Sequence, residues 1–321
     1  MPLKFILNLN MYLEGFERHN DQRTSANLPL RKFGTDLSNL KYLPEAHKQN
    51  VKKKAFEGIS LEIYSEMIRT LYENEEINIP SSDYMLKQSD INSNMRAILI
   101  DWLIYIQYKL KYSGETLYLT VNLIDRYLEK VQVLRKDLQL IGICCMLIAC
   151  KYEEVNVPKI SDLVYITDNA YTNDQVVEME SSILSILEYN ITFTSPLKFA
   201  ERLVREMRFN RKQVALNRYL MELSLLDYRF IKVKPSVLAK ACCLLVNGEN
   251  GKENFEGSWW RGQEKDAKEC AGELAKAIGV LGNCSLQALK NKYSSLEYCE
   301  VALGYRIPVF VEEYFLGHMT N

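Results

Sequence analysis

The stretch Met95–Ile106, with the sequence MRAILIDWLIYI, decides the fold. Its apolar residues follow the i, i+3, i+4, i+7 spacing that lines one face of a helix, and they stand at positions 95, 98, 99, 102, 103 and 106. Asn92 or Ser93 can cap the start of this helix, because such a side chain accepts a hydrogen bond from a free backbone N–H group. The pattern predicts an amphipathic helix that buries one face.

The same period recurs on both sides of this stretch. Upstream, Ile59, Ile63, Met67 and Leu71 are spaced four apart, and their helix should end before the acidic loop that contains Pro80. Downstream, further candidate helices cover 117–128, 138–150, 176–187, 197–207, 214–226, 237–246, 267–281 and 286–293. No comparably convincing alternation of strand type occurs, so the sequence predicts an all-α protein.

The candidate helices fall into two groups. Leu138–Cys150 is apolar almost all round, which predicts a central helix surrounded by others. Leu238–Val246 is a similar run, and each run carries a Cys-Cys pair, as two bundles of the same layout would produce. Between them, Ile191–Thr194 is read as a linker, and Ser195 with Pro196 predicts the start of the second set.

Composition limits the class of protein. The chain has 321 residues, a formal charge of −1 and 47% hydrophobic residues, which suits two domains of ordinary size. The near-neutral balance argues against a protein whose main task is to hold nucleic acid. Residues 1–56 hold ten Lys and Arg against five Asp and Glu, and they are predicted to be a polar, basic, flexible tail.

Cysteine and histidine usage argues against metal and acid–base chemistry. The eight cysteines form no CxxC pair, and we interpret most of them as small buried thiols in a reducing compartment. The three histidines, His19, His47 and His318, lie in the terminal segments, away from any predicted core helix. The longest apolar run is too short to span a bilayer, so a soluble intracellular protein without metal or cofactor is expected.

Several short motifs agree in order and spacing with one known family. They are QSDINSNMRAILIDWL at 88–103, LIDRYL at 123–128, LQLIG at 138–142, CKYEE at 150–154, YITD at 165–168, ME at 179–180, YLMELSLLDY at 219–228 and LKNKY at 289–293. Through these motifs the chain resembles the cyclins, in their mitotic B-type form, over roughly residues 57–305.

This resemblance implies a fold and a domain division. The family fold is two tandem five-helix bundles, called cyclin boxes, preceded by an N-terminal helix. The implied division places that helix and the first box in residues 57–192, the second box in 193–305 and a C-terminal tail in 306–321. The implied function is that of a non-catalytic regulatory subunit, which binds and activates a cyclin-dependent serine/threonine kinase at mitotic entry in the nucleus and cytoplasm.

Two charged residues of the signature have a structural interpretation. Arg96 follows an apolar-face residue on the first helix of the box, and Asp125 lies on the apolar-rich second helix. If both point inward, each needs the other, because an unpaired buried charge is very costly. The resemblance implies such a pair; the alternative is two separate surface charges.

Two further charged residues are implied to bind the kinase. Lys151 ends an apolar helix, where a cation meets the negative end of the helix dipole, and Glu180 lies on an amphipathic helix. The sequence alone would place both in solvent, whereas the resemblance brings them together on the kinase-facing surface. Tyr152, Glu153 and Glu154 are expected to border that surface.

The resemblance also implies a groove for substrates or inhibitors that carry Arg-x-Leu docking segments. Its residues are Met95, Ile98, Leu99, Trp102, Leu138 and Gln139, although such a stripe usually means core. The chain departs from the family at Tyr105, where some cyclins place a glutamate that attracts the basic residue. Tyr105 could replace that attraction with stacking, or could weaken docking.

Degradation signals of the family match only in part. Mitotic cyclins carry an N-terminal destruction box read by a ubiquitin ligase, and residues 31–39 keep its outer Arg31 and Asn39. Gly34 stands where leucine is expected, so the match is degenerate. The KEN triplet at 252–254 is interpreted as coincidence, and the Trp259-Trp260 pair as core or as a partner anchor.

Two other functions compete with this interpretation. A cyclin-fold transcription factor that holds DNA would need basic stripes on its helices, and the only candidate is the cluster of Arg202, Arg205, Arg208, Arg211 and Lys212. An α-helical enzyme would need a nucleophile and base or a metal spacing, and the sequence offers neither. No nucleic acid and no membrane are therefore expected as partners.

Overall fold

The structure is a computed structural model that describes residues 66–80, 83–248, 262–281 and 286–304. The chain divides into two compact units, Met1–Asn74 and Glu75–Asn321. In the first unit the described residues 66–74 are helical, and this helix ends before Pro80 as predicted. Some predictions lie outside the described residues: the tail at 1–56, Arg31 and Asn39, the triplet at 252–254, Trp259 and Trp260, and the tail at 306–321.

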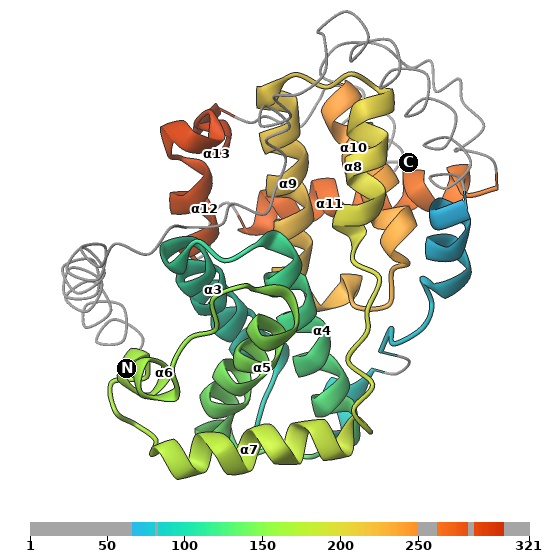
Figure 1. Ribbon diagram of the computed structural model, residues 1–321. Helices are drawn as coiled ribbons and strands as arrows, with labels where there is room; N and C mark the ends of the chain where they lie inside the picture. Colours follow the sequence, from blue (N-terminus) through green and yellow to red (C-terminus); the bar gives the residue numbers. More distant parts are fainter. Residues whose placement is uncertain (1–65, 81–82, 249–261, 282–285, 305–321) are drawn as a thin grey trace, which may run out of the picture. The chain divides into compact units, whose positions relative to one another are not determined.

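The second unit is built from helices joined by loops and short 3-10 turns (Figure 1). Its first five α-helices are α3 (Ser93–Leu110), α4 (Gly114–Lys130), α5 (Leu138–Glu153), α6 (Ile160–Ile166) and α7 (Asn173–Ile186). The next six are α8 (Pro196–Glu206), α9 (Arg211–Leu226), α10 (Pro235–Gly248), α11 (Glu264–Leu281), α12 (Ala288–Tyr293) and α13 (Val301–Gly304). No described residue lies in a strand, and the predicted all-α fold is confirmed.

Polar side chains fix where several of these helices begin. The Asn92 side chain accepts a hydrogen bond from the backbone N–H of Met95, which settles the choice between the two predicted caps. Capping boxes start α7 and α9, because each cap residue and the glutamine three positions later bond to each other's backbone. At α8 the expectation is only half met, since Ser195 occupies the cap position but makes no capping bond.

Each bundle surrounds one apolar helix. In the first, α5 packs against α4, α7 and α3, and every residue from Leu140 to Cys150 is buried. Gly142 permits the close crossing of α3, because a Cβ atom there would lie 2.7 Å from Leu99 Cδ1. In the second, α10 packs against α11, α8 and α9, and the run Pro235–Val246 is wholly buried. The all-round apolar pattern thus predicted both central helices.

The two bundles are joined by polar contacts that the sequence analysis did not predict. The Asp101 carboxylate on α3 accepts hydrogen bonds from the backbone N–H groups of Ala288 and Leu289, at 3.1–3.3 Å, and so caps α12. The buried Lys292 ammonium donates to Gln107 on α3 at 2.8 Å and to Glu222 on α9 at 2.7 Å. Helix α12 therefore ties the second bundle to α3 of the first.

Candidate functional site

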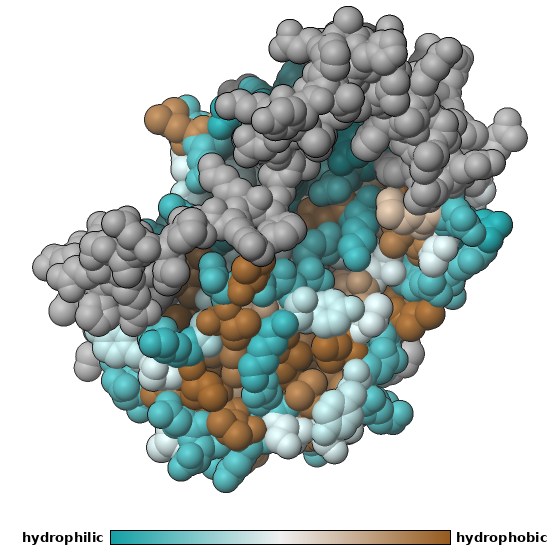
Figure 2. Space-filling view, viewed as in Figure 1, coloured by the Kyte–Doolittle hydropathy of each residue, from teal (hydrophilic) through white to brown (hydrophobic). Residues whose placement is uncertain are grey.

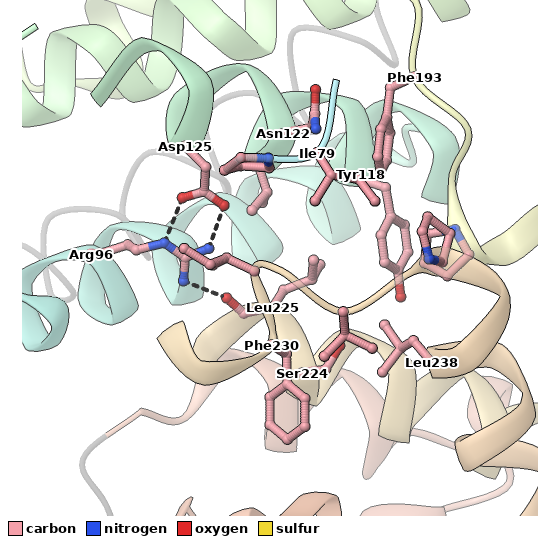
Figure 3. Close-up of a pocket in the computed structure, with 16 residues that line it drawn as sticks. Ile79, Arg96, Tyr118, Asn122, Asp125, Phe193, Ser224, Leu225, Phe230 and Leu238 are labelled. Atoms are coloured by element: carbon pink, nitrogen blue, oxygen red, sulfur yellow. Dashed lines mark hydrogen bonds and ion pairs between the residues drawn. The ribbon is translucent and has the colours of Figure 1, made fainter. Parts of the chain in front are cut away.

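A buried ion pair joins α3 to α4 in the structure (Figure 3). Arg96 Nε and Nη2 donate to the two carboxylate oxygens of Asp125 at 2.6 and 2.7 Å, and both side chains are at most 5% exposed. Tyr84 Oη donates to the same carboxylate at 2.7 Å. Burial and the charge of Asp125 raise the pKa of Tyr84, so this hydroxyl stays protonated. The alternative of two separate surface charges does not describe this chain.

The third donor of Arg96 reaches the second bundle. Arg96 Nη1 donates to the backbone carbonyl of Leu225, at the end of α9, at 2.8 Å. The guanidinium carbon also lies 5.9 Å from the ring centroid of Tyr228, which packs edge-on against Tyr84. One side chain thus positions α3, α4 and α9 together. Leu225 carries no sequence signal for this role, because a backbone carbonyl is available at every residue.

A second ion pair lies at the surface. Lys151 Nζ on the last turn of α5 is 2.6 and 2.8 Å from the carboxylate oxygens of Glu180 on α7. The Lys151 side chain is 48% exposed and that of Glu180 only 12%, so the ammonium keeps a face open to a partner. Among the residues that the structure describes, this pair links the C-terminal end of the central helix to α7.

The chain from the end of α5 to α7 exposes apolar side chains. Each of them is at least 44% exposed, and two stand on the helices that carry the pair, Tyr152 on α5 and Val177 on α7; the others are Val155, Val157 and Tyr165. In Figure 2 hydrophobic residues gather over the bundle that contains α5. A group of exposed apolar residues beside a charged pair is typical of a protein–protein contact.

Glu154 has a structural contact that the sequence did not suggest. Its carboxylate oxygen Oε1 accepts from the backbone N–H of Ser113 at 2.6 Å and from Thr116 Oγ1 at 2.5 Å. Both donors belong to the first turn of α4, so Glu154 holds the end of α5 to the start of α4. Glu153, by contrast, is exposed. Within the CKYEE motif, the Glu154 carboxylate therefore already accepts hydrogen bonds from groups of its own chain.

The six expected groove residues differ in exposure. Ile98 is 48% exposed, and Met95 and Gln139 are half-buried. Leu99, Trp102 and Leu138 are each only 6% exposed, so three of the six expected residues are nearly covered in this structure. At Leu99 the cover comes from α5, which crosses α3 closely at Gly142.

The neighbourhood of Tyr105 carries a positive charge. Lys109 lies one turn further along α3, and its Nζ atom is 5.8 Å from the centroid of the Tyr105 ring. The ring that was expected to stack on a ligand's basic group therefore already meets a cation of this chain.

Two of the five residues in the basic cluster of the second bundle are paired with carboxylates. Arg202 pairs with Glu206 at 2.7 Å, and Arg205 approaches Glu201 at 3.9 Å. Arg211 donates to the backbone carbonyl of Glu297. Paired arginines present a weaker positive field than a basic stripe would, which argues against the DNA-binding alternative. Among the described residues, no group of three His, Cys, Asp or Glu could hold a metal ion.

Comparisons with known proteins agree with this architecture. The profile described as "Cyclin, N-terminal domain" matches residues 66–192, and "Cyclin, C-terminal domain" matches residues 194–305. The chain is 40% identical over 243 residues to Cyclin-B2-1 of Oryza sativa subsp. japonica, covering 74% of this chain and 57% of that protein. It is 35% identical over 249 residues to G2/mitotic-specific cyclin-B of Dictyostelium discoideum, covering 75% and 56%.

A solved structure shares the fold. The viral cyclin from herpesvirus saimiri superposes with a TM-score of 0.53 at 20% identity, over 71% of this chain and 96% of that one. The chain spans a little over half the length of the curated relatives it matches. No helix that the structure describes is long and apolar enough to cross a membrane.

Proposed function

Since the chain belongs to the cyclin family, with B2-type and G2/mitotic cyclins among its relatives, we propose that it is the regulatory subunit of a cyclin-dependent kinase that acts at mitotic entry. The carrying observation is the paired Lys151 and Glu180 beside exposed apolar residues of α5–α7. The subunit supplies no catalytic group. Action in the nucleus and cytoplasm is part of the same proposal.

The geometry suits a partner that offers both polar and apolar groups. The Lys151 ammonium is half open to solvent, and Glu180 holds it in place. An incoming backbone carbonyl can accept from the remaining N–H of Lys151, while Tyr152 and Val177 cover apolar side chains of the partner. Glu153 borders this surface in the proposal, whereas Glu154 acts mainly by fixing the end of α5.

Activation follows from a difference in binding energy between two kinase shapes. A protein kinase needs its lysine–glutamate ion pair formed and its activation loop in place. A rigid helical face that fits only this arrangement shifts the population of the kinase towards it. The buried Arg96–Asp125 pair and the α12 contacts give the face that rigidity.

The test is the double variant Lys151→Ala with Glu180→Ala. Lys151 is half exposed and both charges are removed together, so no charge is left unpaired, and the fold should survive while kinase affinity falls. Kinase binding by calorimetry and phosphorylation of a generic peptide are the measurements. The matched control removes another surface ion pair, Arg205→Ala with Glu201→Ala, and should leave both unchanged. Undiminished binding in the first variant contradicts the proposal.

Substrate recruitment is a second part of the proposed function. A short segment of the Arg-x-Leu class is proposed to place its leucine on the exposed Ile98, beside the half-buried Met95 and Gln139. Because Lys109 already approaches Tyr105, a ligand arginine would meet a like charge, and the leucine should carry the affinity. Buried Leu99, Trp102 and Leu138 support the surface from below.

Because Trp102 is buried and Ile98 is exposed, Ile98 is the residue to change in a test of docking. Trp102→Ala would remove a buried indole and cost about 3–5 kcal/mol of stability. A loss of docking in this variant would therefore not be distinguishable from a loss of folding. Ile98→Asp should instead abolish preferential phosphorylation of docking-segment substrates and spare a short generic peptide. Replacing the arginine of the docking segment by alanine should change its affinity by less than replacing the leucine. A larger effect of the arginine would refute this view of Tyr105 and Lys109.

Regulated destruction is proposed for the segment at 31–39. Arg31 and Asn39 match the outer positions of a destruction box, and a ubiquitin ligase is the implied partner. With Arg31→Ala, the chain should persist through mitotic exit, and its abundance across a synchronised cell cycle is the measurement. A half-life equal to that of the unchanged chain would show that residues 31–39 are not a degradation signal.

A further inference from the structure

One buried glutamine stands between the second box and the end of α5. Gln107 lies near the end of α3, which packs against α12 (Figure 1), and it is only 5% exposed. Its Oε1 atom accepts a hydrogen bond from the Lys292 ammonium of α12 at 2.8 Å. Its Nε2 atom donates to the backbone carbonyl of Tyr112, just beyond the end of α3. The amide thus joins one group of each box.

The donor from the second box is held in place. Lys292 is 2% exposed, and its ammonium also donates to both carboxylate oxygens of Glu222 on α9, at 2.7 and 2.8 Å. Glu222 accepts a further hydrogen bond from the Tyr293 hydroxyl at 2.8 Å. A buried ammonium bonded to a carboxylate has little freedom to move. The Gln107 oxygen therefore meets a donor whose position the second box fixes.

The other end of the glutamine leads to the end of α5. Residues 111–113 join α3 to α4, so the Tyr112 carbonyl belongs to this turn. The next residue, Ser113, donates its backbone N–H to the Glu154 carboxylate at 2.6 Å, and Glu154 is the C-cap of α5. The Tyr112 side chain meets the same end of α5, because burial and the nearby Cys150 and Glu154 raise its pKa. The turn is therefore bonded to Gln107 on one side and to α5 on the other.

We propose that Gln107 is a positioning residue for the kinase-facing surface, which it links through the turn and Glu154 to the Lys292 ammonium of the second box. Lys151 lies on the last turn of α5, three residues before Glu154. An amide suits this position, because the ammonium needs an acceptor and the Tyr112 carbonyl needs a donor. The inference rests on the proposed function, since it takes Lys151 and its neighbours as the groups that bind the kinase.

The test replaces the amide by an apolar side chain of similar length. In the full chain, Gln107→Met should weaken kinase binding, measured by calorimetry, by roughly 5- to 10-fold, an effect of the size that residues in contact commonly transmit. Unchanged affinity would overturn the proposal. This variant loses both side-chain contacts of Gln107 at once, so the turn is no longer tied to the second box.

The matched control is Gln88→Met. Gln88 is another buried glutamine of the first box, 8% exposed, and its side chain bonds to backbone groups of Leu128, Val131 and Val133, towards the opposite end of α4. This variant should also lower the thermal midpoint, but it should leave kinase affinity unchanged. An equal loss of affinity in both variants would overturn the proposal, because destabilisation alone would then explain it.

A double-mutant cycle distinguishes positioning from general support of the fold. If Gln107 acts through Glu154, then Gln107→Met and Glu154→Ala should each lower kinase affinity, and the double variant should lower it little further. Additive losses would overturn the proposal. Should Gln107→Met fail to fold, Gln107→Asn takes its place with the same expectation, because its amide is one methylene too short to reach both partners.

The variant Lys151→Ala with Glu180→Ala distinguishes this inference from the proposed function. If that variant loses kinase affinity while Gln107→Met retains it, only the positioning role is refuted. If that variant keeps its affinity, the proposed function is refuted, and the role of Gln107 with it.

Discussion

At the scale of single residues, burial separates two kinds of ion pair in this chain. Arg96–Asp125 and Lys292–Glu222 are at most 7% exposed, whereas Lys151 is 48% exposed in its pair with Glu180. A buried pair cannot lose one member without leaving a charge in an apolar environment. A surface pair can lose one member at little cost, because water then hydrates the remaining charge. The first kind specifies the fold, and the second is available for recognition.

The Arg96–Asp125 pair allows the first prediction. Arg96→Met should destabilise the chain by about 3–5 kcal/mol, because Asp125 is left buried and unpaired. The double variant Arg96→Met with Asp125→Leu should recover much of this loss, since no charge then remains. Urea unfolding followed by circular dichroism measures both. A double variant that is no more stable than the single one would contradict this account of the pair.

The buried cysteines allow a second prediction. Burial raises the pKa of the Cys144, Cys150, Cys243 and Cys270 thiols to about 12, so they stay protonated at neutral pH. These four thiols should react with a disulfide reagent only after unfolding. The half-buried Cys299 should react in the native chain. Mass-spectrometric mapping of labelled peptides checks this. Fast labelling of any of the four would show that the helix which carries it opens locally.

At the scale of elements, helix ends are held by residues distant in sequence. Glu154 at the end of α5 caps the start of α4, and Asp101 within α3 caps the start of α12. Such caps supply acceptors to N–H groups that have no partner within their own helix. They also hold the end of one helix to another helix. The position of Lys151 on the last turn of α5 therefore depends on Glu154.

The Glu154 cap leads to a third prediction. Glu154→Ala should cost about 1–2 kcal/mol of stability, because Ser113 N–H and Thr116 Oγ1 lose their shared acceptor. The neighbouring control Glu153→Ala removes an exposed carboxylate and should cost less than about 0.5 kcal/mol. Thermal unfolding compares the two. Equal stability of both variants would place Glu154 on the surface, as its position in the motif first suggested.

At the scale of the whole described unit from Glu75, the boxes share their polar network. Lys292 on α12 donates both to Gln107 of the first box and to Glu222 on α9. Glu222 also accepts from Tyr293, and Arg96 of the first box donates to the Leu225 carbonyl of the second. Each box thus lacks partners for some buried groups when it stands alone. Two boxes joined in this way are expected to unfold together.

A fourth prediction follows from this shared network. Lys292→Met should leave Glu222 buried beside Tyr293, lower stability by about 3–5 kcal/mol and keep a single unfolding transition. Urea unfolding monitored by tryptophan fluorescence and by circular dichroism should give coincident curves for the unchanged chain. Two separated transitions in the unchanged chain would mean that the boxes are energetically independent.

The amino-acid sequence by itself determined the helices and their central members. Periodicity of apolar residues is a local property, so Met95–Ile106 and the runs Leu138–Cys150 and Leu238–Val246 identified the elements that the structure contains. Helix bounds shifted by a few residues, because caps such as Asn92 and Asn210 act outside the apolar pattern. The short helix α13 had no such pattern, and the sequence analysis did not predict it.

The tertiary structure alone decided which polar groups meet and which apolar residues are covered. Lys292 and Glu222 are seventy residues apart, and the contact of Arg96 with Leu225 spans 129 residues. Their meeting depends on how the bundles pack, and no local spacing encodes it. The same packing buried Leu99 and Trp102 but left Ile98 open, although all three share one helical stripe. A periodic pattern shows that a face is apolar; only the neighbouring helices decide how much of that face water still reaches.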